Sequence, residues 1–167
     1  GTHYGDSYFT FCESCKLFSP STRLFAIDHW NGDIHSGAYD DSVFKTVSDY
    51  NVKNFPTSQL IKSNFNDAIS FFDDYSIDIL HIDGMHDYES VFNDYNNWFD
   101  KVSETGTILL HDISIKERNF GVHRLWSEIK SLHSHIELDF SCGLGVILKS
   151  RNQLAINLAN IFNCSDI

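Results

Sequence analysis

The sequence predicts a doubly wound α/β fold that ends in an antiparallel pair of strands. Short apolar segments alternate with amphipathic segments of helical period along most of the 167 residues, which is typical of a parallel sheet covered by helices. The alternation stops at 136–140 and 143–148, two strand-like segments joined by a very short turn, so we expect them to pair antiparallel. One domain is expected over 1–150, followed by a C-terminal helix and a linker over 151–167.

The first half of the chain contains two expected strands, each preceded and followed by a helical segment. Val43, Phe44 and Val47 have the spacing of one helical face, which identifies the second helix. The expected elements, in chain order, are a helix over 7–17, a strand over 24–27, a helix over 40–50, a strand over 58–62 and a short helix over 67–72.

The second half is built around a strand over 77–83 that we expect to be covered on both faces. Its apolar residues, among them Ile79 and Leu80, show little alternation with polar ones. The remaining expected elements are a helix over 88–99, a strand over 106–110, a helix over 122–132, the antiparallel pair and a last helix over 153–162.

The charge balance disfavours nucleic acid as a partner. The chain has 23 acidic and 12 basic residues, a net charge of −11, and no run of Lys or Arg that could neutralise phosphates. Apolar runs are far shorter than the roughly 20 residues that cross a bilayer, and no signal-peptide pattern opens the chain. We therefore expect a cytoplasmic protein with a small-molecule substrate, no nucleic-acid partner and no membrane association.

The four cysteines allow two disulfides, a metal site or simple packing. Cys12 and Cys15 lie three residues apart in an apparent helix, where one face would bury both as small hydrophobes. Cys142 and Cys164 lack the close paired spacing of structural zinc sites. Packing is therefore the favoured interpretation.

The opening seven residues form a candidate ligand-binding loop. Two glycines four residues apart stand directly before a helix, an arrangement that lets a ligand approach backbone amides at the positive helix terminus. The alternative is an ordinary glycine turn with Asp6 or Ser7 as helix cap. The candidate cofactor-binding residues of this loop are Gly1, Thr2, His3, Gly5 and Ser7.

Asp28 ends the first expected strand and is a candidate acceptor for two ribose hydroxyls. It lies about twenty residues beyond the glycines, as the acid of a nucleotide-binding unit does. The alternative is a solvated turn aspartate. The neighbouring His29 and Trp30 are candidates to cover a nucleoside, although a Trp here can equally be packing, and 31–39 is a candidate movable cover.

Polar residues also end two later strands. Asp83 and Asp112 follow apolar segments, and carboxylates at the ends of adjacent strands can share a divalent cation that holds a diol and lowers a hydroxyl pKa. His86, three residues beyond Asp83, is the candidate proton acceptor, with Asp83 beside it in the catalytic group. Alternatively, His111 and Asp112 only cap a strand and a helix.

At these residues the sequence resembles a known family, the methyltransferase domains found beside bacterial glycosyltransferases. The shared motifs cover nearly the whole chain and are specific in combination. They are the opening 1–9, the stretch 26–39, the run 79–89 with its Asp-Gly-Met-His core, the segment 106–112 and the helix start 121–126.

The resemblance implies a Rossmann-like class I methyltransferase fold that binds S-adenosylmethionine. The cofactor-binding residues would then be the glycine loop, Asp28, Asn64, Phe65 and Asp83. Similarity to magnesium-dependent sugar O-methyltransferases further implies transfer to a hydroxyl of a sugar or similar polyol, as in bacterial glycan modification. It implies His86 as the base and a Mg²⁺ site at Asp83, His111 and Asp112, where His111 replaces one of two acids in the related pattern.

The resemblance also suggests that the sequence is part of a longer chain. The family places a strand ending in an acid immediately before the glycine loop, and this sequence begins at Gly1. We expect the first strand to lie upstream, and further domains or a homo-oligomer are compatible with that expectation. Two alternative functions remain: a non-catalytic binding module of a glycan-assembly protein, and a metal-dependent hydrolase.

Overall fold

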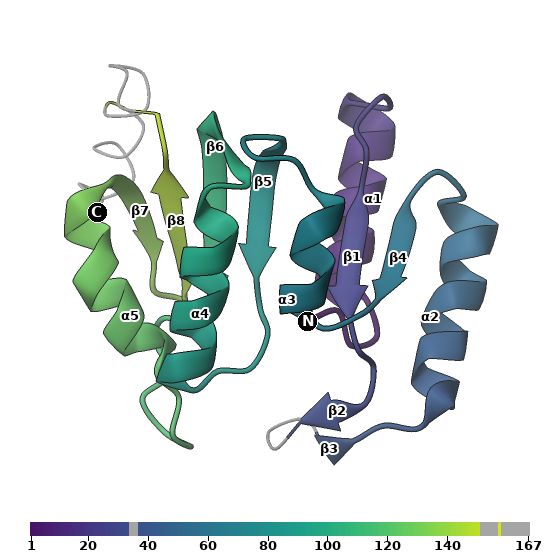
Figure 1. Cartoon of the computed structure of the whole chain (residues 1–167), viewed down its shortest axis with the longest axis horizontal. Helices are drawn as coiled ribbons and strands as arrows, with labels where there is room; N and C mark the ends of the chain where they lie inside the picture. The colour runs from purple at the N-terminus through teal and green to yellow at the C-terminus, as the bar shows by residue number, and fades with distance from the viewer. Residues whose placement is uncertain (34–36, 151–156, 158–167) are drawn as a thin grey trace. The chain divides into compact units, whose positions relative to one another are not determined.

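The chain is described by a computed structural model that covers residues 1–33, 37–150 and 157 (Figure 1). These residues fall into two compact units, Gly1–Ala68 and Ile69–Ile167. Each unit has its own strands and its own buried cluster of side chains.

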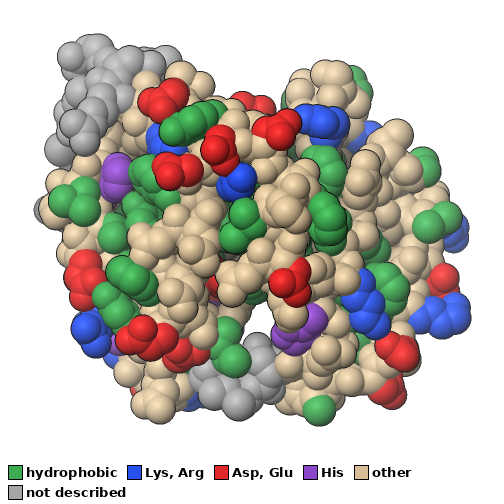
Figure 2. Space-filling model, viewed as in Figure 1, with side chains coloured by type: hydrophobic (Ala, Val, Ile, Leu, Met, Phe, Trp, Pro, Cys, Tyr) green, Lys and Arg blue, Asp and Glu red, His purple; other side chains and the backbone are tan. Residues whose placement is uncertain are grey.

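The surface of the described residues carries charged and polar side chains together with exposed apolar ones, among them Phe18 and Phe140. On the face that Figure 2 shows, acidic side chains are interspersed with basic ones. No helix in this part of the chain is long and apolar enough to cross a membrane.

The first unit is centred on two parallel strands. Strand β1 (Phe25–Asp28) pairs with β4 (Gln59–Lys62) in a register that places Asp28 opposite Lys62. Helices α1 (Asp6–Phe18) and α2 (Asp41–Asn54) precede them in the chain and confirm the predicted β-α alternation. Both strands therefore end at the same edge, which places the polar residues that follow them together.

Two smaller elements complete the first unit. Strands β2 (Gly32–Asp33) and β3 (Gly37–Ala38) pair antiparallel within the predicted cover segment. Helix α3 (Phe65–Ala68) follows β4 directly. The predicted helix over 67–72 thus begins earlier, because the backbone N–H of Ala68 already donates to the carbonyl of Asn64, and the 3-10 helix η1 (Ile69–Phe71) continues it.

Apolar side chains of both helices pack onto the two strands. In one cluster, Tyr8 and Cys12 of α1 lie against Ala26 and Phe55. In the other, Val43 and Val47 of α2 surround Trp30, which is only 1% exposed. Burying side chains of this size stabilises the fold by about 1.5–3 kcal/mol each.

The second unit contains a four-stranded mixed sheet with the order β5-β6-β8-β7. Strand β5 (Ile77–Ile82) pairs parallel with β6 (Val102–His111), and β6 pairs antiparallel with β8 (Leu144–Leu148). The edge strand β7 (Ser134–Leu138) is also antiparallel to β8. The predicted antiparallel ending is therefore confirmed.

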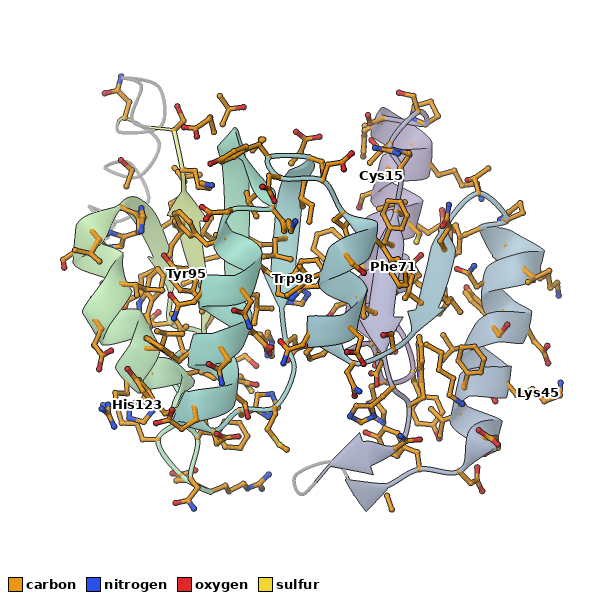
Figure 3. The ribbon with its side chains drawn as sticks, in the orientation of Figure 1. Cys15, Lys45, Phe71, Tyr95, Trp98 and His123 are labelled. Atoms are coloured by element: carbon orange, nitrogen blue, oxygen red, sulfur yellow. The ribbon has the colours of Figure 1, made fainter. Side chains whose placement is uncertain are left out.

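Two helices cover one face of this sheet, α4 (Tyr88–Phe99) and α5 (Val122–Ile129), and η2 (Lys130–Leu132) continues α5 (Figure 1). Tyr95 and Trp98 of α4, both labelled in Figure 3, are buried, since only 7% and 4% of their surface is exposed. These helices share one core with the sheet. Its side chains with no exposed surface are those of Val102, Ile108, Leu110, Leu125 and Ile147.

Two expectations about burial are wrong. Ile79 was expected in a strand covered on both faces, but its side chain is 59% exposed, because both α-helices described in this unit lie on the opposite face. Cys15 is only partly buried, whereas Cys12 is 1% exposed; Cys12, Cys15 and Cys142 are free thiols. The predicted last helix over 153–162 and Cys164 lie outside the described residues, apart from Asn157.

Candidate functional site

Asp28 ends β1 and ties the opening loop to the sheet. Both of its carboxylate oxygens accept hydrogen bonds from backbone N–H groups: Oδ2 from Thr2 at 2.6 Å and His3 at 3.1 Å, and Oδ1 from Trp30 at 2.7 Å. The residue is 8% exposed. Burial raises the pKa of Asp28, but these three bonds outweigh burial and hold it below its usual value. The solvated-turn alternative is thereby excluded, and any ribose contact would add to these bonds.

Gly5 is the residue that turns the opening loop into α1. It is the N-cap of the helix and has a φ of 90°, a left-handed conformation that other residues adopt at a cost. No side chain caps the helix, so the alternative with Asp6 or Ser7 as cap is wrong. The N-terminal N–H groups of α1 are consequently not used by a capping side chain, as an anion-binding or ligand-binding terminus requires.

A cavity of about 370 Å³ lies at the carboxyl ends of β1 and β4. Its lining is polar and includes two predicted cofactor residues, His29 and Asn64, while Phe65 begins the adjoining helix α3. The lining residues are His29, Asn31, Lys62, Ser63, Asn64 and Asp67.

The other aromatic residues of this edge are packed or stacked. Trp30 contacts Phe44 and donates from Nε1 to the carbonyl of His3 at 3.0 Å, so its indole is part of the unit's packing. The ring of His3 stacks on Tyr39 at 5.0 Å. Gly1 and Ser7 are exposed. The packing alternative for Trp30 therefore describes its position best.

In the second unit, Asp83, His86 and Asp112 form a compact cluster. Asp83 and His86 lie in the loop after β5, and Asp112 directly follows β6. One donor atom from each of the three lies within 4.8 Å of the others, with His86 Nε2 at 2.9 Å from Asp112 Oδ2 and 3.5 Å from Asp83 Oδ1. The parallel pairing of β5 and β6 creates this cluster, since it brings both strand ends to one edge.

His111, the last residue of β6, lies next to the same two carboxylates. Its Nδ1 atom is 3.2 Å from Asp112 Oδ1 and 3.6 Å from Asp83 Oδ1. The donor set of two carboxylates and imidazole nitrogens fits a divalent cation. The residues predicted to bind metal and to accept a proton are thus together in this unit.

Asp112 is held in a conformation that a bulky residue seldom adopts. Its φ is 65°, its backbone N–H donates to the carbonyl of Gly143 at 3.0 Å, and the residue is 7% exposed. Gly143 permits this approach, because a Cβ atom there would collide with Ser114. Strained backbone of this kind costs about 1–3 kcal/mol and is concentrated at functional sites.

The charged groups of this cluster shift one another's pKa values. Burial lowers the pKa of His86, but hydrogen bonds to Asp112 and Asp83 outweigh burial and raise it to about 9. Burial raises the pKa of Asp112, but His111 and His86 hold it well below its usual range. The cluster therefore favours a protonated His86 and ionised carboxylates at Asp83 and Asp112.

Two further residues, Phe120 and Gly121, hold His86 in position. The ring of Phe120 stacks on the imidazole at 4.5 Å and 5°, and the backbone N–H of Gly121 donates to the carbonyl of His86 at 2.7 Å. His81 of β5 lies edge-on to His111 at 6.2 Å. Of these, only Gly121 had a signal in the sequence, as the first residue of the shared helix-start motif.

Comparison with known proteins identifies the family. A family model described as a methyltransferase domain matches residues 1–113, more than half of the chain. The chain belongs to the methyltransferase domain family. Membership implies S-adenosylmethionine as cofactor, in agreement with the resemblance seen in the motifs. Among curated proteins, the chain is 36% identical over 147 residues to the uncharacterized protein y4gI of Sinorhizobium fredii, covering 88% of the chain but only 16% of that protein.

Solved structures show that this methyltransferase domain has the class I fold. The O-methyltransferase NovP is similar with a TM-score of 0.64 at 14% identity, over 89% of this chain and 69% of NovP. CalS11, described as a TDP-rhamnose 3'-O-methyltransferase of calicheamicin biosynthesis, gives 0.63 at 10% identity, over 89% and 68%. At these identities the likeness establishes the fold, with the predicted α/β architecture and antiparallel ending.

Proposed function

We propose that this methyltransferase domain transfers a methyl group from S-adenosylmethionine to a hydroxyl of a sugar or similar polyol. The observation that carries the proposal is the cluster of Asp83, His86 and Asp112 at the ends of β5 and β6. Transfer to oxygen requires a group that takes the hydroxyl proton and groups that hold the hydroxyl in place. The imidazole of His86 can take the proton. The carboxylates of Asp83 and Asp112, the second of them 2.9 Å from this imidazole, can hold the hydroxyl.

The first unit supplies the residues proposed for cofactor binding. Gly5 leaves the α1 terminus uncapped, and Asp28 holds the opening loop through Thr2 and His3. His29 and Asn64 line the cavity at the adjoining strand ends. When bound, S-adenosylmethionine supplies a methyl group on a positively charged sulfur that leaves as a thioether. The chain's part is to bind, to orient and to exclude water.

The second unit supplies the residues proposed for proton transfer. His86 must be neutral to accept the hydroxyl proton, but the two carboxylates beside it favour the protonated form. A divalent cation at Asp83 and Asp112 would stabilise the acceptor oxygen and offset the negative charge that keeps His86 protonated. His86 would take the proton at Nε2, and Phe120 and Gly121 keep its ring and its backbone in position.

A sugar or polyol acceptor is supported by the cluster's chemistry. Neighbouring hydroxyls of a sugar suit paired carboxylates and a shared cation. The O-methyltransferases NovP and CalS11 have the same fold, and CalS11 is described as acting on TDP-rhamnose. Sugar nucleotides are therefore the first acceptors to test.

Titration calorimetry with S-adenosylhomocysteine tests cofactor binding. We expect saturable binding to this chain, or to the chain extended before Gly1, and weaker binding in Asp28→Ala, because that variant releases the opening loop. Unchanged affinity in Asp28→Ala would contradict the assignment of the first unit as the cofactor-binding part.

Radiolabelled methyl transfer to a panel of sugar nucleotides tests catalysis. His86→Gln should bind S-adenosylhomocysteine as the unsubstituted chain does but lose about 100-fold or more in turnover, as removal of a general base does. His135→Gln on β7 is the matched control and should leave turnover unchanged. Binding without transfer to any acceptor would favour the non-catalytic binding module.

A further inference from the structure

Two imidazoles face the same pair of carboxylates, and their surroundings differ. His86 Nε2 lies within hydrogen-bonding distance of both Asp83 and Asp112. His111 Nδ1 is within ion-pair distance of both, yet it is shielded from solvent and makes no well-directed hydrogen bond to any described residue. A buried nitrogen with unused bonding capacity lowers stability unless something else binds it.

The separations around His111 suit donors that share one ion. Nδ1 lies 3.2 Å from Asp112 Oδ1 and 3.6 Å from Asp83 Oδ1. Ligand atoms about 2.0–2.1 Å from a common cation are separated by roughly 3 Å from their neighbours. Both separations from Nδ1 are near this value, so His111 lies close enough to each carboxylate to share a cation with it.

The kind of donor determines which cation is preferred. Mg²⁺ takes oxygen ligands in a strict octahedron, whereas imidazole nitrogen suits Zn²⁺, Co²⁺ and other first-row transition metals. His111 also has a fixed place: it is the last residue of β6, paired with Leu144 of β8, and its ring lies edge-on to His81. The nitrogen donor is thus supplied by a paired strand and not by a loop.

We propose that His111 is a metal ligand, and that its imidazole makes the site of Asp83, Asp112 and His111 select a transition-metal dication over Mg²⁺. His86 remains the proton acceptor beside the ion. The inference rests on the proposed function only for the use of the ion, since metal binding itself requires neither cofactor nor acceptor.

Metal titrations of the chelator-treated chain, without S-adenosylmethionine, test this selectivity. Calorimetry with Co²⁺ and with Mg²⁺ gives the ratio of the two affinities. We expect the unsubstituted chain to favour Co²⁺, and His111→Asp to reduce that preference by about tenfold or more, a loss that even an outer partner of a metal ligand can cause. His135→Gln, on β7 and separated from β6 by β8, should keep the original ratio.

Nitrogen-15 spectra of labelled histidine test the ligand directly, because the effect of the metal can be recorded on the unsubstituted chain. Zn²⁺ should shift one Nδ1 resonance, which is absent in His111→Asn and retained in His86→Gln. No saturable metal binding, an unchanged affinity ratio in His111→Asp, or a Zn²⁺ shift confined to His86 would overturn the proposal. A chain that binds Co²⁺ through His111 but methylates nothing would instead overturn the proposed function alone.

Discussion

At the scale of single residues, the buried carboxylates of this domain differ in what compensates for their burial. Asp28 accepts three backbone hydrogen bonds, and Asp112 lies between two imidazoles. Asp94 on α4 is partly buried, and burial is the largest influence on its pKa, which it raises to about 6. Burial without compensation favours the neutral acid, and burial with hydrogen bonds favours the anion.

Asp28 should contribute stability that acid removes. Its pKa in the folded chain is below the unfolded value, so this contribution is present above about pH 4 and is lost as the pH falls through the folded pKa. Asp28→Asn should lower the unfolding free energy at pH 7 by about 1–3 kcal/mol, because an amide replaces an anion that accepts three N–H bonds. Urea unfolding at pH 7 and pH 3 measures this, and a gap between the two chains that does not narrow in acid would contradict it.

Asp94 should show the opposite dependence. Its folded pKa of about 6 lies above the unfolded value, so the folded chain holds more protons and stability falls as the pH rises from about 4 to about 6. Asp94→Asn should therefore raise the unfolding free energy at pH 7 by about 1–3 kcal/mol, since each pKa unit corresponds to about 1.4 kcal/mol. Exposed Asp78→Asn is the control, and equal stability of Asp94→Asn and the parent at pH 7 would count against the raised pKa.

The candidate site was predictable where chemistry follows directly from position in the chain. Asp83, His86 and Asp112 follow the ends of two parallel strands, so their proximity follows from the fold. The stacking of Phe120 on His86 depends on the path of the long loop before α5, which has no periodic signal. Sequence also did not reveal that Asp28 would bind the opening loop's own N–H groups.

At the scale of elements, apolar periodicity predicted most helices and strands, whereas polar residues inside two of the elements obscured their boundaries. Helix α2 continues to Asn54, past the expected end at 50, partly because Asn51 is buried and bonds to Ser58. Strand β6 begins at Val102, four residues before the expected start. Its polar segment 103–105 breaks the apolar pattern, and the pairing with β5 shifts register there.

Gly121 should be required for the placement of the loop that carries His86. Its φ of −115° is open to any residue, so the glycine is needed for space: a Cβ atom would collide with the backbone of Tyr88. Gly121→Ala should destabilise the chain by about 1–3 kcal/mol, as overpacking does, and weaken Co²⁺ binding by moving His86 and Asp83. Thermal unfolding and metal titration measure the two effects.

The matched control for this substitution is Gly37→Ala, whose added Cβ meets no atom within 4 Å, although its φ of 84° adds backbone strain. That variant should lose some stability but keep the metal affinity of the parent. Equal metal affinity in Gly121→Ala and Gly37→Ala would show that the contact with Tyr88 does not position the loop.

At the scale of the whole molecule, the net negative charge of the chain favours a small acceptor over a polyanion such as a nucleic acid. The net charge of −11 arises from acidic residues spread along the chain, with 12 basic residues and no cluster of them. Acidic and basic side chains are interspersed on the face that Figure 2 shows. A nucleic-acid substrate would need a continuous basic surface that releases counterions, and a positively charged sulfonium or a metal ion is favoured instead.

We therefore expect the chain not to bind nucleic acid even at low ionic strength, where salt screens electrostatic attraction least. Non-specific binding proteins have dissociation constants of about 10⁻⁴–10⁻⁶ M at physiological salt and bind more tightly at lower salt. Fluorescence anisotropy with labelled duplex DNA and with a folded RNA, at low ionic strength, should show no saturable change for this chain. Because the acidic chain and the phosphates repel each other, any residual signal should grow as salt is added. Saturable binding that weakens with salt would reveal a basic surface and would redirect the search for an acceptor from sugars to nucleic acids.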